Sequence, residues 1–266
     1  MAITDTTTAY GRFTIADSSV DRVLGTVCIS GLVAVPFLGS LAAMMFLMSG
    51  VALLLRKPAD MVPTILRHWP LLILPLFCVL STLWSRQPNE TFRFAVQLSA
   101  TLGFALALAH SVPARTVVQA LFVVLGAAVM ASVAFGTSRG DGALLGLYGS
   151  KNAMAGAAAL FGVVAFGVVL DPMSPRLLRL CAAIGVCIAP VIVLNAQSVS
   201  ALVVMPIAIT AMLSALALRH LPPLGRIALL TGLGLLTLLA ALAAVSAADS
   251  IATTFLDVTG KDITLT

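Results

Sequence analysis

The sequence predicts an all-α integral membrane protein, a polytopic bundle of about nine transmembrane helices with a cytoplasmic N-terminus. Of its 266 residues, 60% are hydrophobic and only 9% are charged. A soluble domain carries about 25% charged residues, and a soluble chain with far fewer would expose large apolar patches to water. The mean hydropathy is +1.11. These values exclude a soluble enzyme, whatever motifs the chain contains.

The net charge of +5 does not indicate a nucleic-acid binder, because the basic residues are scattered between apolar blocks rather than clustered. The four cysteines lie in apolar blocks and at no metal-binding spacing, so we expect small buried hydrophobes and no metal or other cofactor. They are Cys28, Cys78, Cys181 and Cys187.

Residues 1–22 mix acidic and basic side chains, unlike the short basic start of a cleaved signal peptide. We expect a cytoplasmic tail there and the helix bundle over residues 23–246. The uncharged block 23–55 would reach about 50 Å as one helix, against a hydrocarbon core of about 30 Å.

Pro36, Gly39 and Ser40 lie near the middle of this first block. They predict two short helices, near 23–38 and 40–55, joined by a tight turn. A single long tilted helix is the alternative.

Seven further apolar blocks have the length of a span, about 20 residues, and short polar or proline-containing segments separate them. Many of their positions hold Gly or Ala, which lets membrane helices pack closely. The predicted spans lie near residues 69–84, 92–110, 117–136, 152–170, 177–195, 199–218 and 225–246.

Basic residues predict the orientation, because cytoplasmic loops carry an excess of Lys and Arg. With nine spans and the N-terminus inside, ten basic residues fall on the inner side: Arg12, Arg22, Arg56, Lys57, Arg67, Arg115, Arg176, Arg179, Arg219 and Arg226. Five fall on the outer side: Arg86, Arg93, Arg139, Lys151 and Lys261. Solvated loop charge accounts for Arg86 and Lys261. It accounts less well for the other three, which lie close to apolar helix ends.

The segment WSRQPNETFR, residues 84–93, is the first candidate site. Trp84 suits an interfacial anchor, and Pro88 with Asn89 suits a turn that opens a helix. Polar residues then share one helix face, and a polar stripe in a span should face the bundle interior or a wet cavity. These residues are Glu90, Arg93, Gln97 and Thr101. An internal Glu90–Arg93 pair that closes the helix end is an equally open interpretation.

The second candidate is FGTSRGDGALLGLYGSKNAMAG, residues 135–156, which holds five glycines between Gly136 and Gly149. Arg139 and Lys151 flank the glycines, and Lys151 and Asn152 open a helix. Cations beside a helix N-terminus favour an anion, such as a phosphate on a lipid carrier. The segment lacks the nucleotide-binding GxxxxGK[ST] pattern. A flexible loop with two incidental charges is the alternative.

A third polar segment contains Asn195, Gln197, Ser198 and Ser200, where an ordinary hairpin turn is the favoured interpretation. No two acidic residues are two positions apart, which excludes a DxD metal-nucleotide motif. No acidic residue lies in the middle of a predicted span, and this counts against a proton-driven pump.

Together these segments resemble the O-antigen ligase and polymerase superfamily, most closely its exopolysaccharide-production branch. WSRQPNETFR resembles the element W-S-x-x-P-x-x-T-x-R, and Lys151, Asn152 and Gly156 resemble an element of Lys, Asn and Gly. Ser198 and Ser200 resemble the Ser-x-Ser turn that follows. Many relatives carry a basic residue inside that turn, where this chain has Val199. The likeness runs from about residue 70 to the end.

The resemblance implies a multi-pass glycan transferase of the bacterial inner membrane, active in exopolysaccharide or lipopolysaccharide biosynthesis without a metal or a nucleotide sugar. It implies a polyprenyl-diphosphate-linked glycan as donor, an acceptor hydroxyl on a glycan or lipid, and other polysaccharide-assembly proteins as partners. Arg93, Arg139 and Lys151 would then neutralise the diphosphate, and Gln97 and Asn152 would hold sugar or phosphate oxygens. Polymerase and ligase remain open.

Proteins of this superfamily continue into a large outer loop with an important His. The ending VTGKDITLT resembles the start of that loop. We therefore expect residues 247–266 to begin an incomplete periplasmic loop, and the general base to lie outside this chain.

Two other classes compete with the enzyme. A transporter or flippase should show midplane charges or repeated halves, and the sequence shows neither. A non-catalytic membrane subunit of a polysaccharide export complex is the third interpretation.

Overall fold

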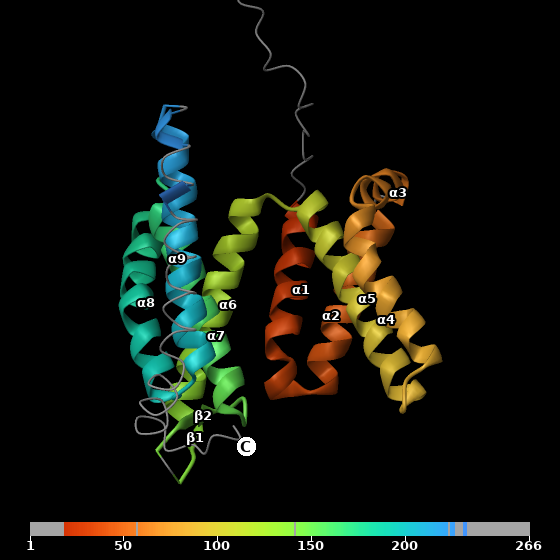
Figure 1. The fold of residues 1–266 in the computed structure, drawn as a ribbon, viewed down its shortest axis with the longest axis horizontal. Helices are drawn as coiled ribbons and strands as arrows, with labels where there is room; N and C mark the ends of the chain where they lie inside the picture. Colours follow the sequence, from red (N-terminus) through yellow and green to blue (C-terminus); the bar gives the residue numbers. More distant parts are fainter. Residues whose placement is uncertain (1–18, 57, 141, 223, 227–230, 233–266) are drawn as a thin grey trace, which may run out of the picture. The chain divides into compact units, whose positions relative to one another are not determined.

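The computed structural model describes residues 19–56, 58–140, 142–222, 224–226 and 231–232 (Figure 1). They divide into two compact units. Unit 1 takes in the described residues up to 134 together with 170–179. It contains α1 (Ser19–Leu38), α2 (Ser40–Arg56), α3 (Pro58–Arg67), η2 (Trp69–Leu72), α4 (Ile73–Leu80), η3 (Ser81–Leu83), α5 (Pro88–Ser111) and nearly all of α6 (Ala114–Phe135).

Unit 2 takes in residues 135–169 and the described residues from 180 onward. It contains β1 (Thr137–Ser138), β2 (Leu144–Gly146), most of α7 (Lys151–Leu170) and α8 (Arg176–Asn195), and α9 (Val199–His220).

Six of the described helices are long and apolar enough to cross a membrane, namely α1, α5, α6, α7, α8 and α9. The chain is therefore a multi-pass helical membrane protein. α2 has 17 residues and meets the same test only together with Met61–Arg67, from which it is bent by 101°. Most of the expected ninth span, 225–246, and all of 247–266 lie outside the described residues, so nine spans stay a prediction.

The break expected inside residues 23–55 is confirmed, and the single long helix is wrong. α1 ends at Leu38 and α2 begins at Ser40. Gly39 between them has φ +55, a left-handed conformation that glycine adopts without strain. The two helices then run back along each other as a hairpin (Figure 1).

The hairpin and α5 pack around one buried cluster. It consists of Cys28, Leu53, Met61, Phe104 and Ala107, from α1, α2, α3 and α5. A Cβ at Gly50 would lie 2.4 Å from the Phe104 ring, so α2 and α5 approach closely because position 50 has no side chain. Phe46 completes the contact, with its ring edge-on to Phe104 at 5.2 Å between centroids.

A half-buried ion pair joins the first turn of α1 to the last residue of α2. Arg56 Nε donates to Asp21 Oδ1 across 2.6 Å. The side chain of Asp21 is 1% exposed, whereas that of Arg56 is 39% exposed. The sequence predicts Arg56 only as a cytoplasmic topological charge, and the structure adds this packing role.

The span expected near 69–84 is corrected in two ways. First, an additional helix, α3, precedes it. Second, the apolar segment is a broken run from Trp69 to Leu83, made of η2, α4 and η3. Pro75 is part of the reason, because it has no N–H to donate to the carbonyl of Leu71. The run reaches about 26 Å, shorter than a hydrocarbon core of about 30 Å.

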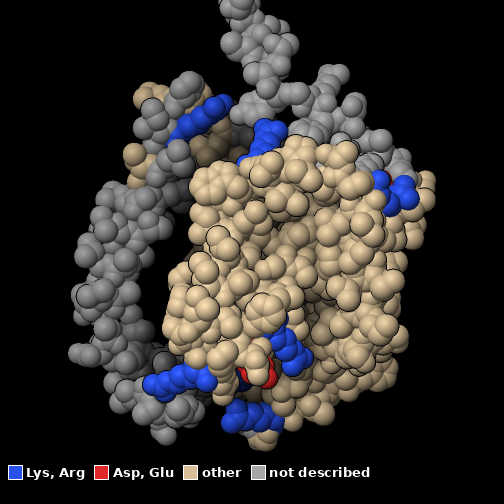
Figure 2. All heavy atoms as spheres, turned by 90° about the vertical axis from the view of Figure 1, so that its right-hand side faces the viewer, with Lys and Arg blue, Asp and Glu red and all other residues tan. Residues whose placement is uncertain are grey.

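Figure 2 shows the face of the molecule that lies on the right in Figure 1, where α3, α4 and α5 are. On the described surface there, Lys and Arg gather at the two ends, and the band between them is uncharged. This is the pattern of a surface whose middle faces lipid, because a charge at that depth is costly.

In unit 2, α7 is the central helix. The share of residues buried in its apolar window is 44%, the highest of the six candidate spans. Small residues allow this packing: a Cβ at Gly162 would lie 2.8 Å from Ala189 of α8 and 3.2 Å from the sulfur of Met205 in α9. α7 therefore approaches α8 and α9 closely at Gly162.

Two of the four cysteines correct the expectation that all are buried. Cys28 is buried and Cys78 is half-buried, but Cys181 and Cys187 are exposed on α8. On α8, Cys187 lies opposite the buried small residues Ala182, Gly185 and Ala189, whereas Cys181 lies at the edge of that buried face. All four are free thiols.

Candidate functional site

The turn before α5 is built by the polar residues of WSRQPNETFR. The hydroxyls of Ser85 and Thr91 lie 2.6 Å apart, and the backbone N–H of Gln87 donates to Ser85 Oγ across 3.1 Å. α5 then begins at Pro88, as predicted, because the missing proline N–H costs nothing at a helix start. Sequence analysis missed the Ser85–Thr91 contact. The feature that could have indicated it is a Ser and a Thr on either side of Pro88.

This turn presents Arg93 and Gln97 on the exposed surface of α5. No hydrogen bond or ion pair involves the guanidinium of Arg93 or the carboxylate of Glu90 within the described part of the chain. The proposed Glu90–Arg93 pair is therefore wrong. Thr101 is half-buried, and its hydroxyl donates to the backbone carbonyl of Gln97 across 2.8 Å.

The glycine-rich segment folds as a β-hairpin, which sequence analysis did not predict. β1 and β2 pair antiparallel, with Thr137 opposite Gly146. At the tip, the N–H of Arg139 donates to the carbonyl of Ala143 (2.8 Å), and the N–H of Gly142 donates to the carbonyl of Arg139 (2.9 Å). These two N–H groups pair within the hairpin, and the side chain of Arg139 is exposed.

The segment after this hairpin leads into α7. Gly146 and Gly149 have φ +61 and +66, which glycine adopts without strain, at the end of β2 and in the turn before the helix. Burial raises the pKa of the Tyr148 phenol between them, so this side chain is protonated at neutral pH. Lys151, half-buried, is the first residue of α7 and Asn152 the second.

Asn152 contacts the third polar segment. The hydroxyl of Ser198 donates to Asn152 Oδ1 across 3.1 Å and lies 3.2 Å from the hydroxyl of Ser200. Ser198 is only 2% exposed. Gln197, with φ 53, forms the turn that brings α9 back beside α7. The interpretation of residues 195–200 as an ordinary hairpin turn is therefore incomplete, because Ser198 also joins α7 to α9.

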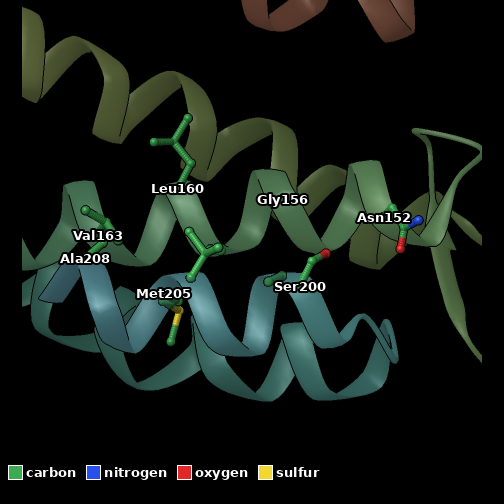
Figure 3. Close-up of a pocket in the computed structure, with 10 residues that line it drawn as sticks. Asn152, Gly156, Leu160, Val163, Ser200, Met205 and Ala208 are labelled. Carbon is green, nitrogen blue, oxygen red and sulfur yellow. The ribbon is translucent and has the colours of Figure 1, made fainter. Parts of the chain in front are cut away.

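A pocket of about 300 Å³ runs between α7 and α9 from this contact (Figure 3). Asn152 and Ser200 lie at one end, and apolar side chains line the rest. A Cβ at Gly156 would meet nothing within 4 Å, so the glycine widens the pocket between its two ends. The apolar lining comes from Ala159, Leu160, Val163, Ala201, Val204, Met205 and Ala208.

The five predicted site residues fall in different units. Arg93 and Gln97 belong to unit 1, whereas Arg139, Lys151 and Asn152 belong to unit 2. Within unit 2, the structure joins Asn152 to Ser198 and Ser200, two residues that we did not place in the site. No group of three or more His, Cys, Asp and Glu able to hold a metal ion occurs among the described residues.

The chain matches no protein-family model, no curated protein and no solved structure.

Proposed function

We propose that this protein is a membrane glycan transferase similar to O-antigen ligases and polymerases. It would join polyprenyl-diphosphate-linked sugar chains or repeat units to an acceptor hydroxyl, on the outer face of a bacterial inner membrane. The proposal includes nine spans and a cytoplasmic N-terminus, which place the three polar segments at outer helix ends. The observation that carries it is the pocket between α7 and α9.

This pocket suits the two halves of such a donor. A polyprenyl diphosphate joins a charged headgroup to a long apolar chain. Asn152 and Ser200 offer an amide and a hydroxyl at one end, beside the N-terminus of α7, where the helix dipole favours an anion. The apolar walls from Gly156 toward Ala208 offer a matching surface to a hydrocarbon chain.

In the reaction, the bond between the anomeric carbon and the diphosphate oxygen breaks. The acceptor oxygen forms the new glycosidic bond, and its proton passes to a base. Negative charge grows on the leaving diphosphate, so cations placed there stabilise the transition state. We assign this role to Arg93, Arg139 and Lys151, and we assign Gln97 and Asn152 to sugar or phosphate oxygens.

The guanidinium of Arg93, which is exposed and has no ion pair with any residue that the structure describes, supports this assignment in unit 1. Arg93 lies in the second turn of α5, just after the Ser85–Thr91 contact at the start of that helix. An arginine offers several N–H donors in a planar fork that matches phosphate oxygens. The guanidinium of Arg93 is therefore a candidate phosphate-binding group near the N-terminal end of the membrane-spanning helix α5.

The test introduces Arg93→Ala, Arg139→Ala and Lys151→Ala separately into the chromosomal gene and measures cell-surface polysaccharide at equal protein level. Loss of one such electrostatic contact lowers the rate about 100-fold to 1000-fold in known cases, so we expect a severe loss of polymer. Arg86→Ala is the matched control, because Arg86 is an exposed cation of the same turn, and it should keep normal output.

The face of the membrane on which lipid-linked glycan accumulates in these variants distinguishes a transferase from a flippase. In the transferase, lipid-linked glycan should build up on the outer face, within reach of an added glycosidase. Normal polymer output from all three variants would refute the assignment of the cations. An intermediate confined to the inner face would refute glycan transfer and favour a flippase.

A further inference from the structure

We infer that α3 and the adjoining Trp69 form a membrane-surface segment that binds anionic phospholipid headgroups. This inference does not depend on the proposed glycan transfer. α3 has ten residues, about 15 Å of helix, which is half of a hydrocarbon core of about 30 Å. Its Met61–Arg67 part is bent by 101° from α2. In Figure 1, α3 is seen end-on beside α4 and α5, and those two helices run from top to bottom of the picture.

One side of α3 is fixed to unit 1. Met61 is 4% exposed and belongs to the buried cluster with Leu53 and Phe104. On the same helix, the hydroxyl of Thr64 lies 3.4 Å from Nδ1 of His110, near the end of α5. These contacts hold α3 across the ends of α2 and α5 rather than parallel to those two helices.

The other side of the segment is apolar and uncovered. Val62, Leu66 and Trp69 are 60%, 66% and 59% exposed. Val62 and Leu66, four residues apart, form an apolar stripe on α3, and Trp69 follows two residues after the helix ends, in η2. A short helix that presents such a stripe lies in the interface plane with its apolar side turned to the acyl chains. Tryptophan is enriched at this depth, because its ring is apolar and its N–H can reach water.

The basic residues beside this apolar stripe determine which class of lipid headgroup the segment prefers. Arg67 follows Leu66, is exposed, and takes part in no hydrogen bond or ion pair within the described part of the chain. Arg56 is already paired with Asp21, and between residues 57 and 69 the sequence has Lys57 and Arg67 against the single acid Asp60. Anionic headgroups are attracted to basic residues at the membrane surface, and zwitterionic headgroups have no net charge to offer. The partner surface is therefore anionic phospholipid.

The test uses the only two tryptophans of the chain, Trp69 and Trp84. Full-length protein with Trp84→Phe is reconstituted in bilayers that contain brominated phosphatidylglycerol or, separately, brominated phosphatidylcholine at equal mole fraction. Trp69 fluorescence should be quenched more by the anionic lipid. One basic residue at the surface contributes a factor of about five in lipid binding, so Arg67→Gln should reduce this preference by about that factor.

Trp84 supplies the matched control. It is 64% exposed at the other end of the apolar run. In protein with Trp69→Phe, Arg67→Gln should leave the quenching of Trp84 unchanged. Equal quenching of Trp69 by both lipids, or a preference that survives Arg67→Gln, would overturn the inference.

A second measurement tests how deep α3 lies. In protein lacking both native tryptophans, Leu66→Trp and Leu76→Trp each place one fluorophore at an exposed position, on α3 and on α4. Bromines near the headgroup should quench the α3 probe most, and bromines deep in the acyl chains should quench the α4 probe most. If deep bromines quench the α3 probe most, α3 belongs to a span and the inference fails.

Discussion

The hydroxyl of Ser198 donates a hydrogen bond to the side-chain oxygen of Asn152 across 3.1 Å, although 46 residues separate them in the chain. The bond joins the first turn of α7 to the residue before α9. It also lies at the polar end of the pocket between these helices. The same contact therefore sets the spacing of two helices and orients the amide that we assign to the site.

A double-mutant cycle on this pair should show coupling. Asn152→Ala and Ser198→Ala each remove one partner, so the double variant should be less destabilised than the sum of the single variants. Hydrogen bonds between membrane helices give couplings of about 0.5–1.5 kcal/mol. Reversible unfolding of the purified protein in detergent measures the free energies.

Ser214→Ala is the control for that cycle. The hydroxyl of Ser214 donates to the carbonyl of Thr210 within α9, so its change should add to Asn152→Ala without coupling. Strict additivity for the Asn152 and Ser198 pair as well would show that the contact contributes nothing to stability.

Gly50→Ala should destabilise unit 1. The added Cβ would lie 2.4–2.7 Å from three ring atoms of Phe104, whose side chain is 4% exposed and enclosed by the core cluster. Overpacking of this kind costs about 1–3 kcal/mol. Gly103→Ala is the control on α5, because a Cβ there meets nothing within 4 Å. Thermal unfolding should separate the two variants, and an equal effect would contradict the close α2–α5 contact.

Asp21→Asn should weaken the α1–α2 hairpin, because it leaves the guanidinium of Arg56 without its carboxylate partner at 2.6 Å. Breaking a fully buried ion pair costs about 3–5 kcal/mol. Since the side chain of Arg56 is 39% exposed, we expect a smaller loss of about 1–3 kcal/mol after solvent screening. Limited proteolysis should then cut near Gly39 faster.

The control for that loss is Arg67→Gln, which removes an exposed cation at the same end of unit 1 and should leave the proteolysis rate unchanged. If Asp21→Asn is cut no faster than the native chain, the ion pair does not hold the hairpin.

Asp171 should make stability depend on pH. Burial alone would raise its pKa, but the N–H of Met173, the hydroxyl of Ser174 and the guanidinium of Arg115 together hold the pKa below its ordinary value. Arg115 contacts both carboxylate oxygens, at 2.8 and 3.3 Å. Because the folded pKa is the lower one, this stabilisation is present above the unfolded pKa of about 3.9 and is lost as the pH falls through the folded value.

Thermal unfolding from neutral pH down to the acid limit tests this dependence. The difference between the native chain and Asp171→Asn should be constant above the unfolded pKa and shrink below it. Arg115→Gln should lower stability at neutral pH, whereas Arg176→Gln, which removes an exposed cation near the same loop, should not. A difference that grows in acid would contradict the lowered pKa.

Local features of the sequence predicted much of the fold. The helix start at Pro88 and the break at Gly39 were predicted because proline and glycine act on their own few residues. The broken run from Trp69 to Leu83 was missed because an apolar segment of span length reads as one helix until its hydrogen bonds are traced. The β-hairpin was missed because glycine-rich composition does not show which N–H and carbonyl groups pair.

The candidate site was predicted only in part for the same reason. Arg93 was selected for its charge near an apolar helix end and Asn152 through the family resemblance, and both site assignments stay predictions. The contacts of Ser85 with Thr91 and of Ser198 with Asn152 were missed, because a small polar residue in a turn has many possible partners.

By itself, the sequence determined that the chain is a multi-pass helical membrane protein and where most helices begin and end, because hydrophobic length and helix-breaking residues are read one segment at a time. Only the tertiary structure decided that Ser198 meets Asn152, that Asp21 is buried against Arg56, and that α3 turns across the ends of its neighbours. These facts depend on how each helix is rotated and packed against others, and that is set by close contacts between residues far apart in the chain.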